Sequence, residues 1–436
     1  MSDFVQKALA RQPAAPEWLL PFNALGRENS RGKSLPSIRV EDWKYTSLRA
    51  LEEGSFVKEP EHVEPSPDLA ARFQIPDLDA YRLVFVNGHY SATFSDAANL
   101  PKGMTLTTFA NAEENAVEEV RAHLGEVSDG DRLFSALNAS WLADGVFLHI
   151  ARNTKVDKPV QLVWLSTPQS EAFGIAQRLL VVMEEGSEAA VLEQFVSTDE
   201  PQNVFTNGVS EFVIGDNAQL RHCRLHLEEP GAIHVGAVHA SVGRNAVLSG
   251  FHVALGGRLK RNDIQVRMRG EGGHCELNGV YLPRNREVID YHTCIEHEVP
   301  NCTSEETFRG IIADEARAVF NGRIHIHRDA QKTSAHLSNR NLLTSNKAEV
   351  DTKPELEIYA DDVQCSHGAT VAQLDEGHLY YLLSRGVSEQ EAQVLLSFGF
   401  INEILNRIRR EALQNYLRAE LRGLFAQDDH LTRHLL

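Results

Sequence analysis

The chain has 436 residues, 42% of them hydrophobic, and a formal net charge of -18 at pH 7. This length allows two or three folded domains, and the hydrophobic content predicts a globular protein rather than a disordered one. The acidic charge opposes nucleic-acid binding, because phosphates would be repelled and the sequence contains no basic stripe. We therefore expect neither DNA nor RNA as a partner.

The first residues, Met1 to Lys7, have neither the basic region nor the apolar core of a signal peptide. No run of residues approaches the ~20 apolar residues of a membrane-spanning helix. We therefore expect a cytoplasmic protein without membrane contact. The five cysteines show no Cys-x-x-Cys spacing, which predicts free thiols rather than disulfides.

Residues 1–145 combine helical and hairpin patterns. Asn87-Gly88 separates two arms in which apolar residues alternate, a pattern typical of a β-hairpin with a type I′ turn. A helical period follows at 131–142. These patterns predict an N-terminal α/β region.

Residues 146–375 are predicted to be all β, because short alternating strands follow one another with almost no helical periodicity. Four similar tight turns in this zone each lead into a strand. Their last residues lie 29, 28 and 28 positions apart, at Ala189, Ala218, Ala246 and His274. A fixed period of this size without helices predicts a β-solenoid, in which each coil stacks on the next. A β-sandwich with evenly spaced hairpins is the alternative.

Residues 376–436 are predicted to be helical. Ser388 and Glu391 form a capping-box pattern, and two helices are expected with a break near Gly399. One helical face is more apolar than two helices alone can bury, and it includes Leu395, Phe398, Ile401 and Leu405. Such a face either packs on its own domain or binds another protein.

The most specific chemical pattern is Cys365-Ser366-His367 in a strand-like run. In an extended strand, residues i and i+2 point to the same face, so Cys365 and His367 would lie side by side. A thiolate and an imidazole suit zinc, copper or iron-sulfur chemistry. Two ligands cannot complete a tetrahedral site. The pair is therefore predicted to be part of a metal site that is completed elsewhere in the chain or by a partner.

Other candidate patterns are weaker. Nineteen histidines make chance pairs common, so these further His and Cys groups are expected to be ordinary packing or surface residues: His222, Cys223, His226, His292, Cys294, His325 and His327. The run Gly26–Ser34 has five residues between its glycines where a phosphate-binding loop needs four. No motif of a serine hydrolase or zinc protease occurs. We therefore expect neither an ATPase nor another enzyme.

Four segments in order resemble the SufB/SufD family of iron-sulfur cluster assembly subunits. They are Arg39–Thr46, Ala330–His336 leading to residues 351–358, Asp361–Thr370, and Ser384–Gly386. The ordered set spans nearly the whole chain and is more specific than any single segment. This resemblance implies a right-handed parallel β-helix between helical terminal regions, in agreement with the repeat pattern.

The resemblance also implies a non-catalytic scaffold in a complex of one SufB, one SufD and two copies of the ABC-type ATPase SufC. The last coils would pair with SufB, placing His367, with Cys365 beside it, where a nascent cluster is thought to form. His367 would act as a ligand or as a proton acceptor. SufB has an essential cysteine where this chain has His336, a difference that favours the SufD branch.

By the same resemblance, the C-terminal helices from about 388 to 425 would dock SufC, with Leu395, Phe398, Ile401 and Leu405 as candidate contacts. The isolated chain would hold no stable cofactor, and the complex only a transient iron-sulfur cluster or iron.

Two other interpretations remain open. One is a stand-alone carbohydrate-active enzyme on a β-solenoid, and the other is a purely structural subunit without metal contact. Because the terminal strands of a solenoid are edges that favour pairing, a homodimer is also expected when SufB is absent.

Overall fold

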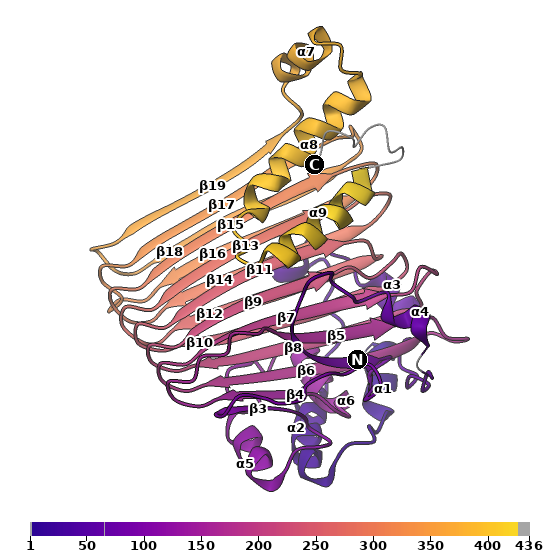
Figure 1. Cartoon of the computed structure of the whole chain (residues 1–436), viewed down its shortest axis with the longest axis vertical. Coiled ribbons are helices and arrows are strands. Elements are labelled where there is room, and N and C mark those ends of the chain that lie inside the picture. Colours follow the sequence, from indigo (N-terminus) through magenta and orange to yellow (C-terminus); the bar gives the residue numbers. More distant parts are fainter. Residues whose placement is uncertain (1, 65, 426–436) are drawn as a thin grey trace.

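The computed structural model describes residues 2–64 and 66–425. Most of the described chain winds into stacked coils, and each coil contributes one strand to each of two long sheets (Figure 1). All neighbouring strands from β4 onward are parallel within their sheet, for example β13 with β15. The predicted parallel β-solenoid is therefore confirmed, and the β-sandwich alternative is wrong. Residues 426–436 of the expected helical region lie outside the described part.

The two sheets are named here by their strand numbers. The even-numbered sheet comprises β4 (Val146–Ile150), β6 (Phe173–Met183), β8 (Val204–Ile214), β10 (Ile233–Val242), β12 (Leu259–Met268), β14 (Val288–His297), β16 (Arg317–Ile326) and β18 (Glu349–Ile358). The odd-numbered sheet comprises β5 (Val160–Ser166), β7 (Glu188–Ser197), β9 (Gln219–His226), β11 (Val247–Leu255), β13 (His274–Leu282), β15 (Thr303–Ile312), β17 (Ser334–Leu343) and β19 (Gln364–Ala372). Apolar side chains from both sheets meet inside the coils and form one continuous core.

The coil turns explain the repeat, with a small change of register. Gly186, Asn217, Asn245 and Gly272 all have positive φ, at 71°, 58°, 52° and 75°. Gly and Asn are the residues that adopt this conformation most readily. Gly186 therefore occupies the position of Asn217, not that of Gly215, and β7 pairs with β9 through Glu188 and Gln219. Two sequence-aligned positions, Ala189 and His274, are thus displaced by one or two residues.

The N-terminal region covers the first coils and the outer face of the even-numbered sheet. It contains α1 (Asp3–Ala10), α2 (Leu20–Ser30), α3 (Arg49–Glu53), α4 (Pro67–Ala70), α5 (Glu114–His123), α6 (Leu133–Trp141), β1 (Tyr81–Val86), β2 (His89–Tyr90) and β3 (Met104–Thr108). Phe4 and Trp141 pack with Phe205 of β8. The hairpin prediction is confirmed, because β1 and β2 pair antiparallel around Asn87 and Gly88, both with positive φ.

Three C-terminal helices follow the last strand: α7 (Glu376–Ser384), α8 (Glu389–Leu405) and α9 (Glu411–Phe425). The Glu391 amide donates to the Ser388 side chain at 3.3 Å, as the capping pattern predicts. The expected break at Gly399 is wrong, since α8 continues through it to Leu405. Packing of the apolar face outweighs the roughly 1 kcal/mol that a helical glycine costs. No helix in the described ranges has the length and apolar character needed to cross a membrane.

A charged network occupies the interior of the middle coils. Glu193 Oε1 accepts hydrogen bonds from Ser210 Oγ at 2.7 Å and Arg224 Nη1 at 2.9 Å, and it lies 2.9 Å from His222 Nε2. Burial alone would raise the pKa of Glu193, but the charge of Arg224 and the contact with His222 lower it to about 2. Burial lowers the pKa of His222 below its ordinary value of 6.5. The network therefore holds a carboxylate and a neutral imidazole.

This network predicts that acid destabilises the fold. His222 takes up protons more readily in the unfolded chain than in the folded one, so the free energy of unfolding decreases as pH falls below 6.5. It decreases further near pH 4.5, where Glu193 becomes protonated only when unfolded. Urea titrations followed by circular dichroism at pH 7.5, 6, 5 and 4 measure this dependence. The variant His222→Gln should show a weaker dependence of the unfolding free energy on pH between pH 7.5 and 5. Equal stability of the wild type at pH 7.5 and 5 would contradict the prediction.

Candidate functional site at the last coil

Cys365 and His367 lie on β19, the last strand of the odd-numbered sheet. They pair in register with Ala335 and Leu337 of β17, both of which are buried in the core of the solenoid. Cys365 and His367 therefore share the inward-facing side of their strand, as the sequence predicted. No described coil follows, so His367 is exposed and Cys365 is only half-buried.

The surroundings of this pair are apolar and open to solvent. Ile358 on β18 and Val371 on β19 are 40% and 48% exposed, although both continue rows of inward-facing residues. Tyr359 beside them is 61% exposed. Burial raises the pKa of the Cys365 thiol above its usual value, which keeps the sulfur protonated at neutral pH. In the chain alone, Cys365 is therefore a thiol at the rim of an uncovered core.

His336 does not join this pair on the same face. It lies on β17 opposite Ser366 of β19, and its Nδ1 atom is 2.7 Å from Ser366 Oγ. Because side chains alternate along a strand, His336 and Ser366 point outward while Cys365 and His367 point inward.

The other His and Cys groups of the sequence are separated by the fold. His222 and His226 are buried inside, whereas Cys223 packs beside the C-terminal helices. Three further residues, His292, Cys294 and His325, lie along the even-numbered sheet on β14 and β16. Cys294 Sγ accepts from Arg323 at 3.4 Å, and His325 Nδ1 lies 2.8 Å from Glu357. None of these residues is a strand-pairing partner of Cys365 or His367, whose partners are Ala335 and Leu337.

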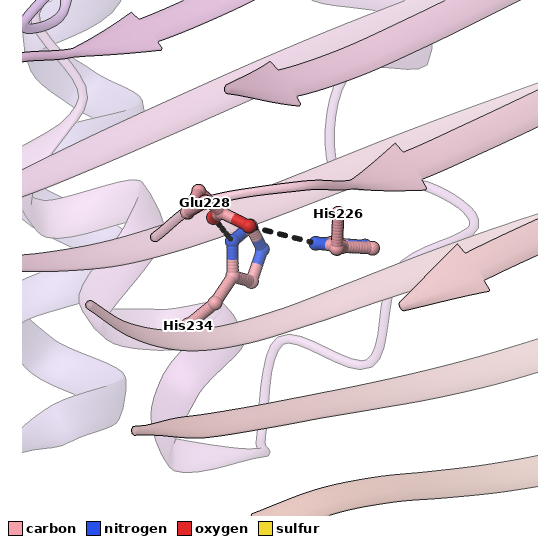
Figure 2. A group of neighbouring side chains, drawn as sticks. All are labelled: His226, Glu228 and His234. Carbon is pink, nitrogen blue, oxygen red and sulfur yellow. Dashed lines mark hydrogen bonds and ion pairs between the residues drawn. The ribbon is translucent and has the colours of Figure 1, made fainter. Parts of the chain in front are cut away.

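The structure instead gathers a group that sequence patterns missed: His226, Glu228 and His234, with candidate ligand atoms within 4.8 Å of one another (Figure 2). His234 Nδ1 lies 2.8 Å from Glu228 Oε1, and His226 Nδ1 lies 3.9 Å from Glu228 Oε2. All three side chains are buried. The only sequence signal is the spacing of His226 and Glu228, because His234 comes from the opposite sheet.

This buried group does not suit a metal ion. Lys260 Nζ already lies 3.0 Å from Glu228 Oε2, and Arg224 Nε donates to His226 Nε2 at 3.1 Å. The bond from Arg224 leaves the proton of neutral His226 on Nδ1, the atom that faces Glu228. A divalent ion would add charge beside two buried cations, at a large desolvation cost. The group is therefore a hydrogen-bonded ion cluster whose positive charge comes from Lys260 and Arg224.

The apolar face of α8 packs on its own chain. Phe398, Ile401 and Leu405 are 6%, 0% and 0% exposed and contact the outer face of the odd-numbered sheet, while Leu395 is half-buried. Of the two interpretations of this face, the structure supports packing within the chain. The three buried side chains cannot reach a partner while α8 lies there, which corrects the expectation that they form an open docking face.

The exposed apolar side chains of the C-terminal region lie on α7 instead. Tyr380, Tyr381 and Leu383 are 74%, 57% and 39% exposed, and α7 has no buried residue. Figure 1 shows α7 projecting past the end of the solenoid, above the last strands. α7 is joined to β19 by residues 373–375 only.

Comparison with known proteins adds an independent result. A family model described as SUF system FeS cluster assembly, SufBD core domain, matches residues 166–400, and one described as SufBD protein N-terminal region matches residues 25–162. The two matches together cover both the solenoid and most of the N-terminal region.

Individual relatives align along most of their length. An iron-sulfur cluster assembly SufBD family protein of Synechocystis is 34% identical, over 88% of this chain and 86% of the relative. The iron-sulfur cluster assembly protein SufD of Escherichia coli is 33% identical, over 89% and 88%. SufD of Bacillus subtilis is 26% identical, over 94% and 95%. The chain therefore belongs to the SufBD family of SUF-system iron-sulfur cluster assembly proteins.

Proposed function

We propose that this chain is the SufD-type scaffold subunit of a SUF complex and catalyses no reaction by itself. Its open last coil would pair with a SufB-type subunit and enclose the place where a cluster forms. The observation that carries this proposal is the position of Cys365 and His367 on the inward face of β19, with no further coil to cover them. The resemblance to SufD relatives supports the choice of subunit.

The physical reason for pairing is the unfinished solenoid. Among the described residues, β18 and β19 each have a strand neighbour on one side only, so their free edges present unpaired backbone groups. Exposed Ile358 and Val371 add apolar surface that a second solenoid end would bury. A SufB-type partner with a similar solenoid would satisfy both needs and could supply the missing ligands. In its absence the same edges would pair two copies of this chain.

At the enclosed site, Cys365 and His367 would meet iron and sulfide as cargo rather than as a resident cofactor. Two ligands from one chain are too few to hold a cluster, so loading would be transient and would need the partner. His367 would contribute a neutral imidazole, either as a ligand or as the acceptor of a proton from an incoming thiol. Cys365 would have to lose its thiol proton to bind metal, and further burial at the interface opposes that loss. It would therefore act as a ligand only when the incoming metal ion displaces the proton.

We also propose that α7 presents the docking surface for a SufC-type ATPase. Tyr380, Tyr381 and Leu383 are exposed together on a helix with no buried residue. The short connection 373–375 links this helix directly to β19. A movement of α7 driven by ATP would therefore pull on the strand that carries Cys365 and His367, which would couple nucleotide state to the cluster site.

The enzyme alternative is not favoured. The core-domain family match describes iron-sulfur cluster assembly, and the buried carboxylates Glu228 and Glu193 are already paired with Lys260 and Arg224.

The substitution His367→Ala should abolish most cluster loading, because it removes the imidazole from the proposed site. The complex should still assemble, because His367 is exposed in the single chain and contributes little to its folding. We expect iron and sulfide retained by the co-expressed complex to fall by roughly tenfold or more. Iron and sulfide analysis after co-purification with SufB and SufC measures this. The matched control is His336→Ala, on the adjacent strand but facing outward, which should retain loading. Normal iron and sulfide loading of the His367→Ala complex would show that His367 is not part of the cluster site.

Substitution of Tyr380 and Tyr381 by Ala should weaken the association with the ATPase without lowering the melting temperature, since neither ring is buried. Phe398→Ala is the contrasting variant. It should destabilise the chain by about 3 kcal/mol, because it leaves a cavity beneath α8. Affinity for the ATPase by calorimetry and thermal unfolding of the isolated chain separate the two effects. If the Tyr380 and Tyr381 variant binds the ATPase like the wild type, α7 is not the docking helix.

A further inference from the structure

A cavity of about 310 Å³ lies between the N-terminal region and the outer face of the even-numbered sheet. This volume is at the lower end of the range for small-molecule sites. Its walls come from the segment 33–43, the first turn of α6 and the outward-facing residues of β8, β10 and β12. The cavity contains none of the residues that form the last-coil site.

The N-terminal end of α6 opens into this cavity. Arg132 occupies the cap position, and its side chain makes no capping hydrogen bond. Leu133, Phe134 and Ser135, the first three residues of the helix, all line the cavity. The amide groups of a first helical turn have no partner within the helix, and the helix dipole places partial positive charge there. This end of the cavity is therefore suited to an oxyanion.

Two deeply buried side chains in the same wall have polar atoms without hydrogen-bond partners. His239 on β10 is 2% exposed, and neither of its ring nitrogens has a partner in the described structure. Asn207 on β8 is fully buried, and its Oδ1 atom is also unpartnered, although its Nδ2 donates to Phe134. Burial lowers the pKa of His239 to about 4, so its neutral ring offers one donor and one acceptor. Buried polar atoms normally have partners, which points to a ligand that supplies them.

The charges around the cavity leave one cation without a counter-charge. Asp263 is held by Arg261 at 3.0 Å and lies 3.5 Å from Arg132. Asp42 at the wall also acts electrostatically on both arginines. Lys33, in contrast, donates only to a backbone carbonyl, that of Asp131, and has no carboxylate partner among the described residues. Its ammonium group is therefore available to a bound anion.

The remaining wall is apolar and includes Trp43, Val209, Val235 and Ala237. We propose that this cavity binds a small organic anion with an aromatic or apolar body. Its carboxylate or phosphoryl oxygens would lie at the end of α6 near Lys33, its body would contact Val209 and Ala237, and its polar substituents would meet His239 and Asn207. This site is separate from the cluster site and does not depend on the function proposed above.

Isothermal titration of the full chain with four probes tests the proposal. Phenyl phosphate and phenylacetate are aromatic anions of the two possible kinds, benzyl alcohol lacks the charge, and inorganic phosphate lacks the apolar body. At least one aromatic anion should bind about tenfold more tightly than benzyl alcohol and than inorganic phosphate. The preferred anion identifies a phosphoryl or a carboxylate ligand. Absence of binding by both anions, or equal binding by either control, overturns the proposal.

Two variants locate the binding. Ala237→Leu fills the apolar wall and Lys33→Gln removes the free cation, so each should weaken the preferred probe about tenfold. The matched controls are Ala190→Leu, on the outer face of the odd-numbered sheet, and Lys347→Gln, whose partner is Glu315. Both controls should bind like the wild type. If Ala237→Leu fails to fold, the affinity of the Lys33→Gln variant alone tests whether the probe binds in the cavity. If the cavity variants bind the probe like the wild type, the ligand binds elsewhere and the assignment is overturned.

Discussion

Parallel coils stack in register along this molecule, and that stacking determines where its core, its ends and its helices can lie. A coil can bury its inner face only against the coil before it and the coil after it. At the N-terminal end, β1, β2 and β3 complete the two sheets with strands from outside the repeat. At the other end β18 and β19 have no such cover within the described chain. The stacking that buries the core therefore leaves the strand edges and the inward-facing residues of the last coil uncovered, and Cys365 and His367 lie on that coil.

The stacking rule also explains how charged residues can be buried in the middle coils. Arg224 is fully buried, yet its guanidinium contacts Glu193, Ser210 and the Phe195 ring. Lys260 similarly neutralises Glu228. Burial of such pairs costs desolvation energy, and well-packed apolar residues could often replace them without loss of stability. Their value lies in registration, because a coil displaced by one residue would turn these charges outward and separate them.

The helices divide the outer surfaces between two roles. α8 and α9 cover the odd-numbered sheet with apolar side chains and belong to the core in every physical sense. α7 covers nothing and exposes two tyrosines beside the open end. On the opposite side, the N-terminal region covers the even-numbered sheet incompletely, and a cavity with unpartnered polar atoms remains between them. Each of these features follows from where the helices lie, which no periodicity along the chain records.

Local patterns along the chain were enough to predict the repeat and the facing of side chains on a strand. The spacing of Gly and Asn turns indicated a solenoid because the left-handed turn position admits few other residues, and the alternation of a strand placed Cys365 and His367 on one face. The register inferred from the repeat was wrong by one or two residues. The same positive-φ turn position is occupied by glycine at Gly186 and by asparagine at Asn217. Which faces of the strands and helices contact one another became clear from the folded chain alone. Phe398 and Ile401 are buried between α8 and the odd-numbered sheet. His336 faces away from Cys365 and His367, and His234 reaches Glu228 from the other sheet. Those outcomes depend on contacts between residues in different coils and elements, and the pattern of a single segment carries no information about its neighbour in space.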